Sequence, residues 1–146
     1  MFVATGTDHQ PQRIAVHVHE AALRWTQVWT TGWARQDAEA IVELQAEDGV
    51  HWSTPFDSPH RGRAGLRKYL QDAFASEVEP TRARFAAPLV QGEQAAAEYW
   101  ALCRYDSGPL TISGCTMLRF DTRGLVVESW DYSYVIPGHV PFPFDW

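Results

Sequence analysis

Four polar side chains in the C-terminal third of the chain have the right chemistry and spacing to act together on a small molecule. Tyr99, Thr116, Ser129 and Asp131 lie in three strand-like segments that are separated by turn signals. Successive side chains of a strand point to opposite faces, so pairing fixes which residues share a face. Hairpin pairing across the two turns places all four residues on one face, where a carboxylate, a phenol and two hydroxyls could move protons.

Tight turns at 106–109 and 121–124 predict the register of the two hairpins. Tyr99 then pairs with Thr116, and Thr116 with Ser129, while Asp131 pairs with Gly114. This face also carries small residues, which leave room for a pocket. The opposite face carries large ones: Trp100, Leu102, Met117, Trp130, Tyr132 and Tyr134. We therefore expect Asp131 to point into a cavity, although a carboxylate satisfied by neighbouring hydroxyls remains the alternative.

The same register bears on the two cysteines. Cys103 faces Ile112 and lies on the other side of the sheet from Cys115, too far for a disulfide, whose Cα atoms lie within about 7 Å. No Cys/His cluster has zinc spacing, so no metal is expected. No glycine-rich phosphate loop or dinucleotide motif is present, so no cofactor is expected either.

Composition narrows the class of partner. The 146 residues are 45% hydrophobic and 21% charged, which is ordinary for one globular domain. The net charge of −6 argues against nucleic acid, which requires clustered Lys and Arg. No apolar run approaches the ~20 residues of a membrane helix, and no signal peptide opens the chain. We therefore expect a cytoplasmic protein, with reduced cysteines and no membrane partner.

Helices are predicted first and strands second. Residues 17–36 form a helix in which Trp25, Trp29 and Trp33 recur on one face; they either line a ligand site or belong to the core. Further elements are predicted as follows: a short helix capped by Asp37, a strand at 50–54, a helix from Gly62 with Tyr69 on its buried side, and strands at 81–90, 94–105, 110–120 and 125–135. Residues 1–12 are expected to be a disordered lead, 13–136 the domain, and 137–146 an extended tail.

Short motifs stand in a fixed order along residues 20–135. They are Trp29-x-x-x-Trp33, Gln36 to Ile41, Ala46 to Asp48, Arg61 to Ala64, Glu98 to Trp100, Leu118 to Asp121, Gly124 to Glu128 and Trp130 to Tyr132. Their number, order and spacing resemble the SnoaL-like branch of the nuclear transport factor 2-like superfamily. The resemblance implies an α+β fold: three N-terminal helices packed on a strongly curved, mostly antiparallel sheet that forms a cone-shaped barrel.

The resemblance does not carry a complete catalytic set. Trp130-Asp131-Tyr132 resembles the last strand of limonene epoxide hydrolase-type proteins, whose Asp points inward and handles a proton. Their Arg and second Asp fall at Tyr99 and Ala101. The ketosteroid isomerase pattern also breaks, because its base falls near Ser53 or Thr54, its acid at Thr116 and its oxyanion-hole tyrosine at Trp29.

The resemblance implies a different polar set. His51 and Ser53 stand where the hydrolase holds a water, which would bring His51 and Asp131 into one cavity as a proton-transfer pair. Tyr99 would then donate to a substrate oxygen. The alternative is a strand histidine satisfied by solvent or backbone.

Two functions remain open. One is an enzyme that acts by acid/base chemistry on an apolar, aromatic or polyketide-like metabolite, through cyclisation, isomerisation, dehydration or water addition. The other is a non-catalytic binding or assembly module of the same fold. In both, the partner is a small apolar or aromatic ligand held by Trp25, Trp29, Trp33, Ser53, Tyr69, Thr116 and Ser129. The aromatic opposite face further predicts a homodimer through the sheet, unless the chain's own tail covers it.

Overall fold

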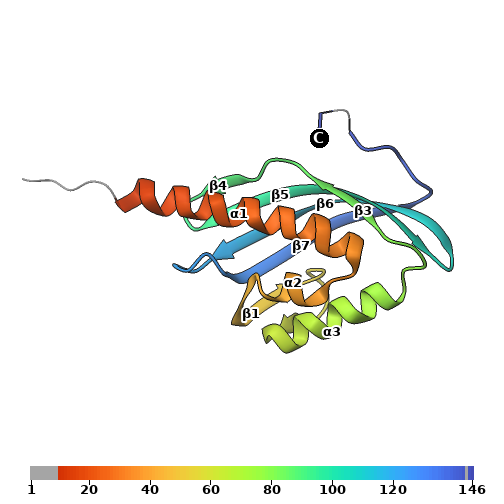
Figure 1. The fold of residues 1–146 in the computed structure, drawn as a ribbon, viewed down its shortest axis with the longest axis horizontal. Coiled ribbons are helices and arrows are strands. Elements are labelled where there is room, and N and C mark those ends of the chain that lie inside the picture. The colour runs from red at the N-terminus through yellow and green to blue at the C-terminus, as the bar shows by residue number, and fades with distance from the viewer. Residues whose placement is uncertain (1–9, 144) are drawn as a thin grey trace, which may run out of the picture.

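The computed structural model describes residues 10–143 and 145–146. Three helices pack on a mixed, mostly antiparallel sheet, which confirms the α+β prediction (Figure 1). They are α1 (Gln10–Arg35), α2 (Ala38–Val42) and α3 (Gly62–Ala75). None of the helices in the described ranges is long and apolar enough to span a bilayer.

Seven strands form the sheet: β1 (Gln45–Trp52), β2 (His60–Arg61), β3 (Arg82–Phe85), β4 (Leu89–Gln91), β5 (Gln94–Tyr105), β6 (Gly108–Phe120) and β7 (Val126–Pro137). Their order is β2-β1-β7-β6-β5-β3, with β4 also paired to β5. Among the strand pairs of the described residues, β1–β7 is parallel and the others are antiparallel. The sheet curls around the helices, but its edge strands do not meet, so the expected cone is an open one.

Local chemistry explains the short helices. The Asp37 side chain accepts a hydrogen bond from Ala40 N at 3.1 Å, which caps α2 as the sequence predicts. Gly62 has a φ of 68°, a conformation that favours glycine, and it opens α3. One core joins α1 to the sheet through Ala22 and Trp25, packed with Leu118.

The hairpin register differs from the prediction by two residues, while the faces are as predicted. Tyr99 pairs with Gly114 rather than Thr116, and Thr116 pairs with Asp131 rather than Ser129. The first turn is shorter than expected because Tyr105 already pairs with Gly108. A bulge near Phe120 lengthens the second turn. A shift of two keeps every side chain on its face, because the side-chain period of a strand is two.

Several boundaries also differ. The first helix begins at Gln10, so residues 10–12 of the expected lead are helical, and residues 1–9 lie outside the described residues. The first strand covers residues 45–52 rather than 50–54. The predicted strand at 81–90 is divided into β3 and β4 by a segment that contains Pro88, which cannot donate to a ladder.

The cysteines and the tail lie on defined sides of the sheet. Both cysteines are free thiols, and Cys103 pairs with Leu110 rather than the expected Ile112. After Pro137 the chain crosses the outer face, where the Trp100 indole donates to the carbonyl of Val140 at 2.9 Å. Arg84 lies 4.3 Å from the centre of the Phe142 ring.

Candidate active site

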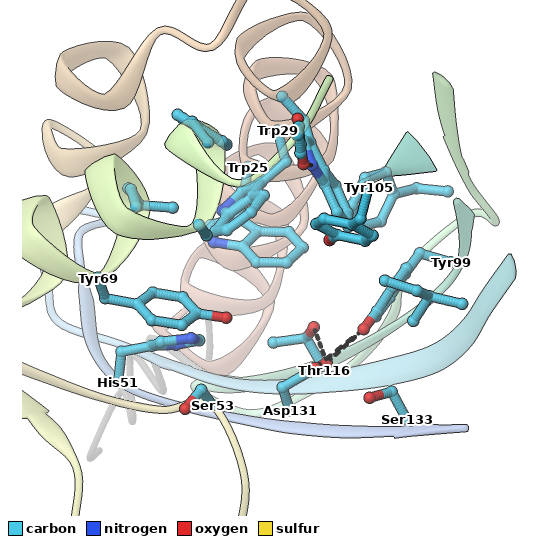
Figure 2. Close-up of a pocket in the computed structure, with 17 residues that line it drawn as sticks. Trp25, Trp29, His51, Ser53, Tyr69, Tyr99, Tyr105, Thr116, Asp131 and Ser133 are labelled. Atoms are coloured by element: carbon cyan, nitrogen blue, oxygen red, sulfur yellow. Dashed lines mark hydrogen bonds between the residues drawn. The ribbon is translucent and has the colours of Figure 1, made fainter. Parts of the chain in front are cut away.

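A cavity of about 180 Å³ lies between the helices and the inner face of the sheet (Figure 2). Helix α1 contributes Trp25, Trp29 and Trp33 to its wall. The remaining lining residues are His51, Ser53, Tyr69, Leu70, Ala73, Phe74, Glu77, Phe85, Tyr99, Tyr105, Ile112, Thr116, Asp131 and Ser133. Trp25, His51 and Thr116 are among the parts of the lining that are almost completely buried.

Asp131 is held at the cavity wall by two neutral donors. The Tyr99 hydroxyl lies 3.0 Å and 2.9 Å from the two carboxylate oxygens, and the Thr116 hydroxyl donates to Oδ1 at 3.2 Å. Strand register explains this cluster. Thr116 pairs directly with Asp131, and Tyr99 lies one row away, opposite Gly114. The Tyr99 and Asp131 side chains point toward each other in Figure 2.

Burial shifts the proton affinity of this group. It raises the pKa of the Asp131 carboxyl to about 6, although the hydrogen bonds from Tyr99 and Thr116 act in the opposite direction. Burial and the nearby Asp131 charge also raise the pKa of the Tyr99 phenol, and they raise that of Tyr69 to about 12. Near neutral pH, Asp131 can therefore exchange a proton, while both phenols remain protonated donors.

His51 lines the same cavity but has a different partner. Its Nδ1 lies 2.7 Å from the Ser129 hydroxyl. The part of the chain that the structure describes shows no hydrogen bond between His51 and Asp131, so the expected pair is not in direct contact. Burial, helped by nearby His60, lowers the pKa of His51 to about 4. The imidazole is consequently neutral at pH 7.

The sequence leaves His60 either solvated or at the mouth of the pocket, and it does not predict the contacts with Tyr69 and Ser53. The His60 ring stacks on Tyr69 at a centroid distance of 4.4 Å, and its Nε2 lies 3.1 Å from the Ser53 hydroxyl. Burial lowers the pKa of His60. The strand pair β1–β2, which brings His60 opposite His51, has no signal in the sequence beyond the Pro-rich loop between them.

Five aromatic rings form a closed circuit in the cavity wall. The adjoining centroids are 5.6 Å apart for Trp25–Trp29, 6.0 Å for Trp29–Trp33, 6.2 Å for Trp33–Tyr99, 5.6 Å for Tyr99–Phe85 and 5.5 Å for Phe85–Trp25. The Trp33 indole also donates to a Glu77 carboxylate oxygen at 2.7 Å. We use the name aromatic ring for the circuit of five side chains: Trp25, Trp29, Trp33, Tyr99 and Phe85.

The structure gathers most of the predicted ligand residues. Trp25, Trp29, Trp33, Ser53, Tyr69 and Thr116 all line the cavity, whereas Ser129 lies behind His51 and lines a small separate void. Missed lining residues include Glu77 and Phe85. Ile112 and Ser133 also line the cavity, and the alternation of strand side chains places both on the same face as Asp131. Nothing in the sequence places Glu77, which follows α3 and reaches Trp33 across 44 positions.

Metal binding has no support in the described ranges, where no group of three or more His, Cys, Asp or Glu side chains could hold an ion.

The comparisons with known proteins agree with this architecture. The family of the SnoaL-like domain matches residues 25–129. This chain belongs to the SnoaL-like domain family. The match includes the three tryptophans of the aromatic ring and ends two residues before Asp131. No curated protein matches the chain.

Two solved structures share the fold at low sequence identity. One is a hypothetical protein with a ketosteroid isomerase-like fold from Catenulispora acidiphila DSM 44928, in complex with trimethylamine. It has a TM-score of 0.64 and 18% identity, with coverage of 73% of this chain and 82% of its own. The other is SalBIII, an epoxide hydrolase/cyclase-like enzyme in pyran ring formation in the polyether salinomycin. Its TM-score is 0.69 and its identity 14%, with coverage of 87% and 97%.

Proposed function

We propose that this SnoaL-like domain is a cofactor-independent enzyme that uses Asp131 as a general acid/base on a small molecule. The observation that carries the proposal is a carboxyl group at the cavity wall with a pKa of about 6 and only neutral hydrogen-bond partners. A general acid/base group works best when its pKa lies near the operating pH.

The proposed chemistry moves one proton through Asp131. The ionised carboxylate takes a proton from a substrate C–H or O–H group, or from a water that attacks the substrate. The protonated carboxyl then returns that proton to another substrate atom, so the enzyme ends unchanged. A carboxylate offers about four lone-pair sites. Tyr99 and Thr116 can fill only one each, so sites remain for the reacting proton.

Tyr99 differs from its expected role as a donor to a substrate oxygen. Its hydroxyl has one proton, and Asp131 already accepts it. We assign Tyr99 and Thr116 the positioning of the carboxylate. His51 also lines the cavity, and as a neutral imidazole it can hold a substrate oxygen or water.

The size of the cavity narrows the substrate. Pockets for drug-sized ligands are typically about 300–1,000 Å³, and this one is about 180 Å³. The proposed substrate is therefore about one ring in size, or one ring of a longer aromatic or polyketide-like metabolite. Cyclisation, isomerisation, dehydration and water addition all fit a single acid/base group. The part that SalBIII plays in pyran ring formation supports cyclisation within that set.

A non-catalytic binding module is the alternative. Trp25 is 5% exposed and belongs to a hydrophobic core, so this part of the cavity wall has a structural role that requires no catalysis. This reading predicts ligand binding without turnover.

Proton exchange separates the two functions without knowledge of the natural substrate. Single-ring ketones, enones and epoxides are incubated with the protein in D₂O, and deuterium incorporation and product formation are followed by NMR. We expect Asp131→Asn to lower the rate by about 10²–10⁴-fold. Glu98→Gln, which removes an exposed carboxylate one residue from Tyr99, is the control. Exchange at the wild-type rate in Asp131→Asn would reject the acid/base role.

The outer face of the sheet is a candidate surface for binding a second copy of the chain. Met117, Tyr132 and Tyr134 are exposed there, and the half-buried Trp100 donates its indole N–H to the tail at Val140. Exposed aromatic groups of this kind mark association surfaces. We propose a two-fold homodimer through this face. A cytoplasmic location and reduced cysteines, expected from the sequence, stay predictions.

A further inference from the structure

We propose that the cavity selects a small cationic amine, such as a quaternary ammonium group, over a neutral molecule of the same shape. This inference rests on the proposed small-molecule function and names the chemical class of the ligand. It is carried by the charges of the lining residues and by the geometry of the aromatic ring.

The lining side chains have negative charge and no positive counterpart. Asp131 and Glu77 are the carboxylates among the described lining residues, and none of the others is Lys or Arg. His51 is neutral, because burial keeps its pKa near 4. The described wall of the cavity therefore has two acidic side chains and no cationic one.

Neither carboxylate has a cationic partner in the described part of the chain. Asp131 accepts hydrogen bonds from Tyr99 and Thr116, and Glu77 accepts them from Trp33 at 2.7 Å and Gln36 at 3.3 Å; all four donors are neutral. The ion pairs of the described residues all lie elsewhere, between other side chains. Both carboxylates are half-buried, and charges that are withdrawn from water are normally paired, so a bound cation would supply a countercharge.

The two carboxylates lie beside the aromatic ring. Trp33 donates to Glu77, Tyr99 donates to Asp131, and the Trp33 and Tyr99 rings are adjacent at 6.2 Å. The five rings meet at angles between 36° and 84°, so their faces and edges point in different directions around the cavity wall.

Aromatic faces are electron-rich and attract cations within about 6 Å of the ring centre, and Trp is the strongest of them. The aromatic ring contains three Trp residues, and Figure 2 shows Trp25 and Trp29 on the side of the cavity opposite Asp131. A cation there would lie between the tryptophan side chains and a carboxylate. A neutral molecule of equal size gains the apolar contact alone.

A pair of isosteric probes tests this inference on the wild-type chain. Choline and 3,3-dimethylbutan-1-ol have the same shape, but only choline has a positive charge. Isothermal titration calorimetry at pH 8 should show choline binding at least about tenfold more tightly, the size expected from partly desolvated cation–π contacts. Equal affinities, tighter binding of the neutral alcohol, or no binding of choline at millimolar concentration would overturn the inference.

Charge-removing variants locate the effect. Glu77→Gln and Asp131→Asn should each weaken choline binding by about three- to tenfold and change the affinity for the neutral alcohol by less than about twofold. Glu98→Gln removes the same charge from the exposed face of β5 and should leave both affinities unchanged. A loss of choline affinity of the same size in Glu98→Gln would contradict a local site.

The test is independent of the acid/base proposal. Equal affinities for the two probes would remove the cation inference, while Asp131-dependent proton exchange in uncharged ketones could still hold. Conversely, a choline preference combined with wild-type exchange in Asp131→Asn would keep the cation site and reject the catalytic role of Asp131.

Discussion

The Tyr99 ring lies against the Cα of Gly114, its pairing partner across β5 and β6. A methyl group at position 114 would come within 2.6 Å of Tyr99 Cζ and 2.7 Å of its hydroxyl oxygen. The absence of a side chain at Gly114 is therefore what allows the phenol to cross β6 and reach Asp131 on β7.

Gly114→Ala should consequently displace the Tyr99 phenol from Asp131. Overpacking of this kind typically costs about 1–3 kcal/mol of unfolding free energy. Because the hydrogen bond from Tyr99 favours the charged carboxylate, the pKa of Asp131 should rise above its present value of about 6. Urea unfolding and a ¹³C NMR titration of the Asp131 carboxyl would measure both effects. Ser113→Ala, on the adjacent position of β6, is the control; an unchanged pKa in Gly114→Ala would contradict the account.

The pH dependence of stability should contain two opposing contributions. The folded pKa of Asp131 is raised from 3.8 to about 6, so its ionisation is harder in the native state, and stability falls as the pH rises from about 4 to 6. The folded pKa of His51 is lowered from 6.5 to about 4, so stability falls as the pH drops from 6.5 to 4. Each contribution is on the order of 3 kcal/mol.

Asp131→Asn should separate these contributions. We expect the variant to be more stable than wild type at pH 8, and to lose that advantage by pH 4, where the unfolded-state aspartate is about half protonated. His51→Gln should instead flatten the acid side of the curve. Chemical denaturation at intervals between pH 4 and 8 measures both. If Asp131→Asn shows the same difference from wild type at every pH, the carboxyl does not have a raised pKa.

His51 and Asp131 should act independently on the rate of reaction. Each has its own hydrogen-bond partner, Ser129 for His51 and Tyr99 with Thr116 for Asp131. The rate losses of His51→Ala and Asp131→Asn in the proton-exchange assay should therefore multiply in the double variant. Groups that work as one proton-transfer unit are non-additive. A double variant no slower than the worse single one would restore the pair expected from the sequence.

The outer face of the sheet should hold a homodimer together. Stable interfaces bury about 1,200–2,000 Å² in total, and Tyr134, which is 84% exposed, lies on the part of β7 that the tail leaves open. Tyr134→Arg should shift the mass measured by light scattering at micromolar concentration from dimer to monomer. Phe56→Ser changes an aromatic residue that lies in a loop and is 92% exposed, and it should leave the dimer intact. A monomeric wild-type protein would reject the proposal.

Alternation along the chain was enough to assign the faces of the sheet. The predicted and observed registers both place Tyr99, Thr116 and Asp131 on one face. Each predicted hairpin register was wrong by two residues, which equals the side-chain period of a strand. The helical spacing of Trp25, Trp29 and Trp33 likewise placed three indoles on one wall of the cavity. These patterns are local, because the geometry of a single strand or helix determines which of its side chains share a face.

Only the tertiary structure decided which of these groups touch. Turn length set the true register and made Thr116, rather than Gly114, the cross-strand partner of Asp131. The parallel pairing of β1 with β7 placed His51 beside Ser129, and the end of α3 brought Glu77 to Trp33. Such contacts join residues tens of positions apart, and they depend on how whole elements pack rather than on the residues between them. The raised pKa of Asp131 has the same origin. It comes from burial by elements that are distant from β7 in the sequence.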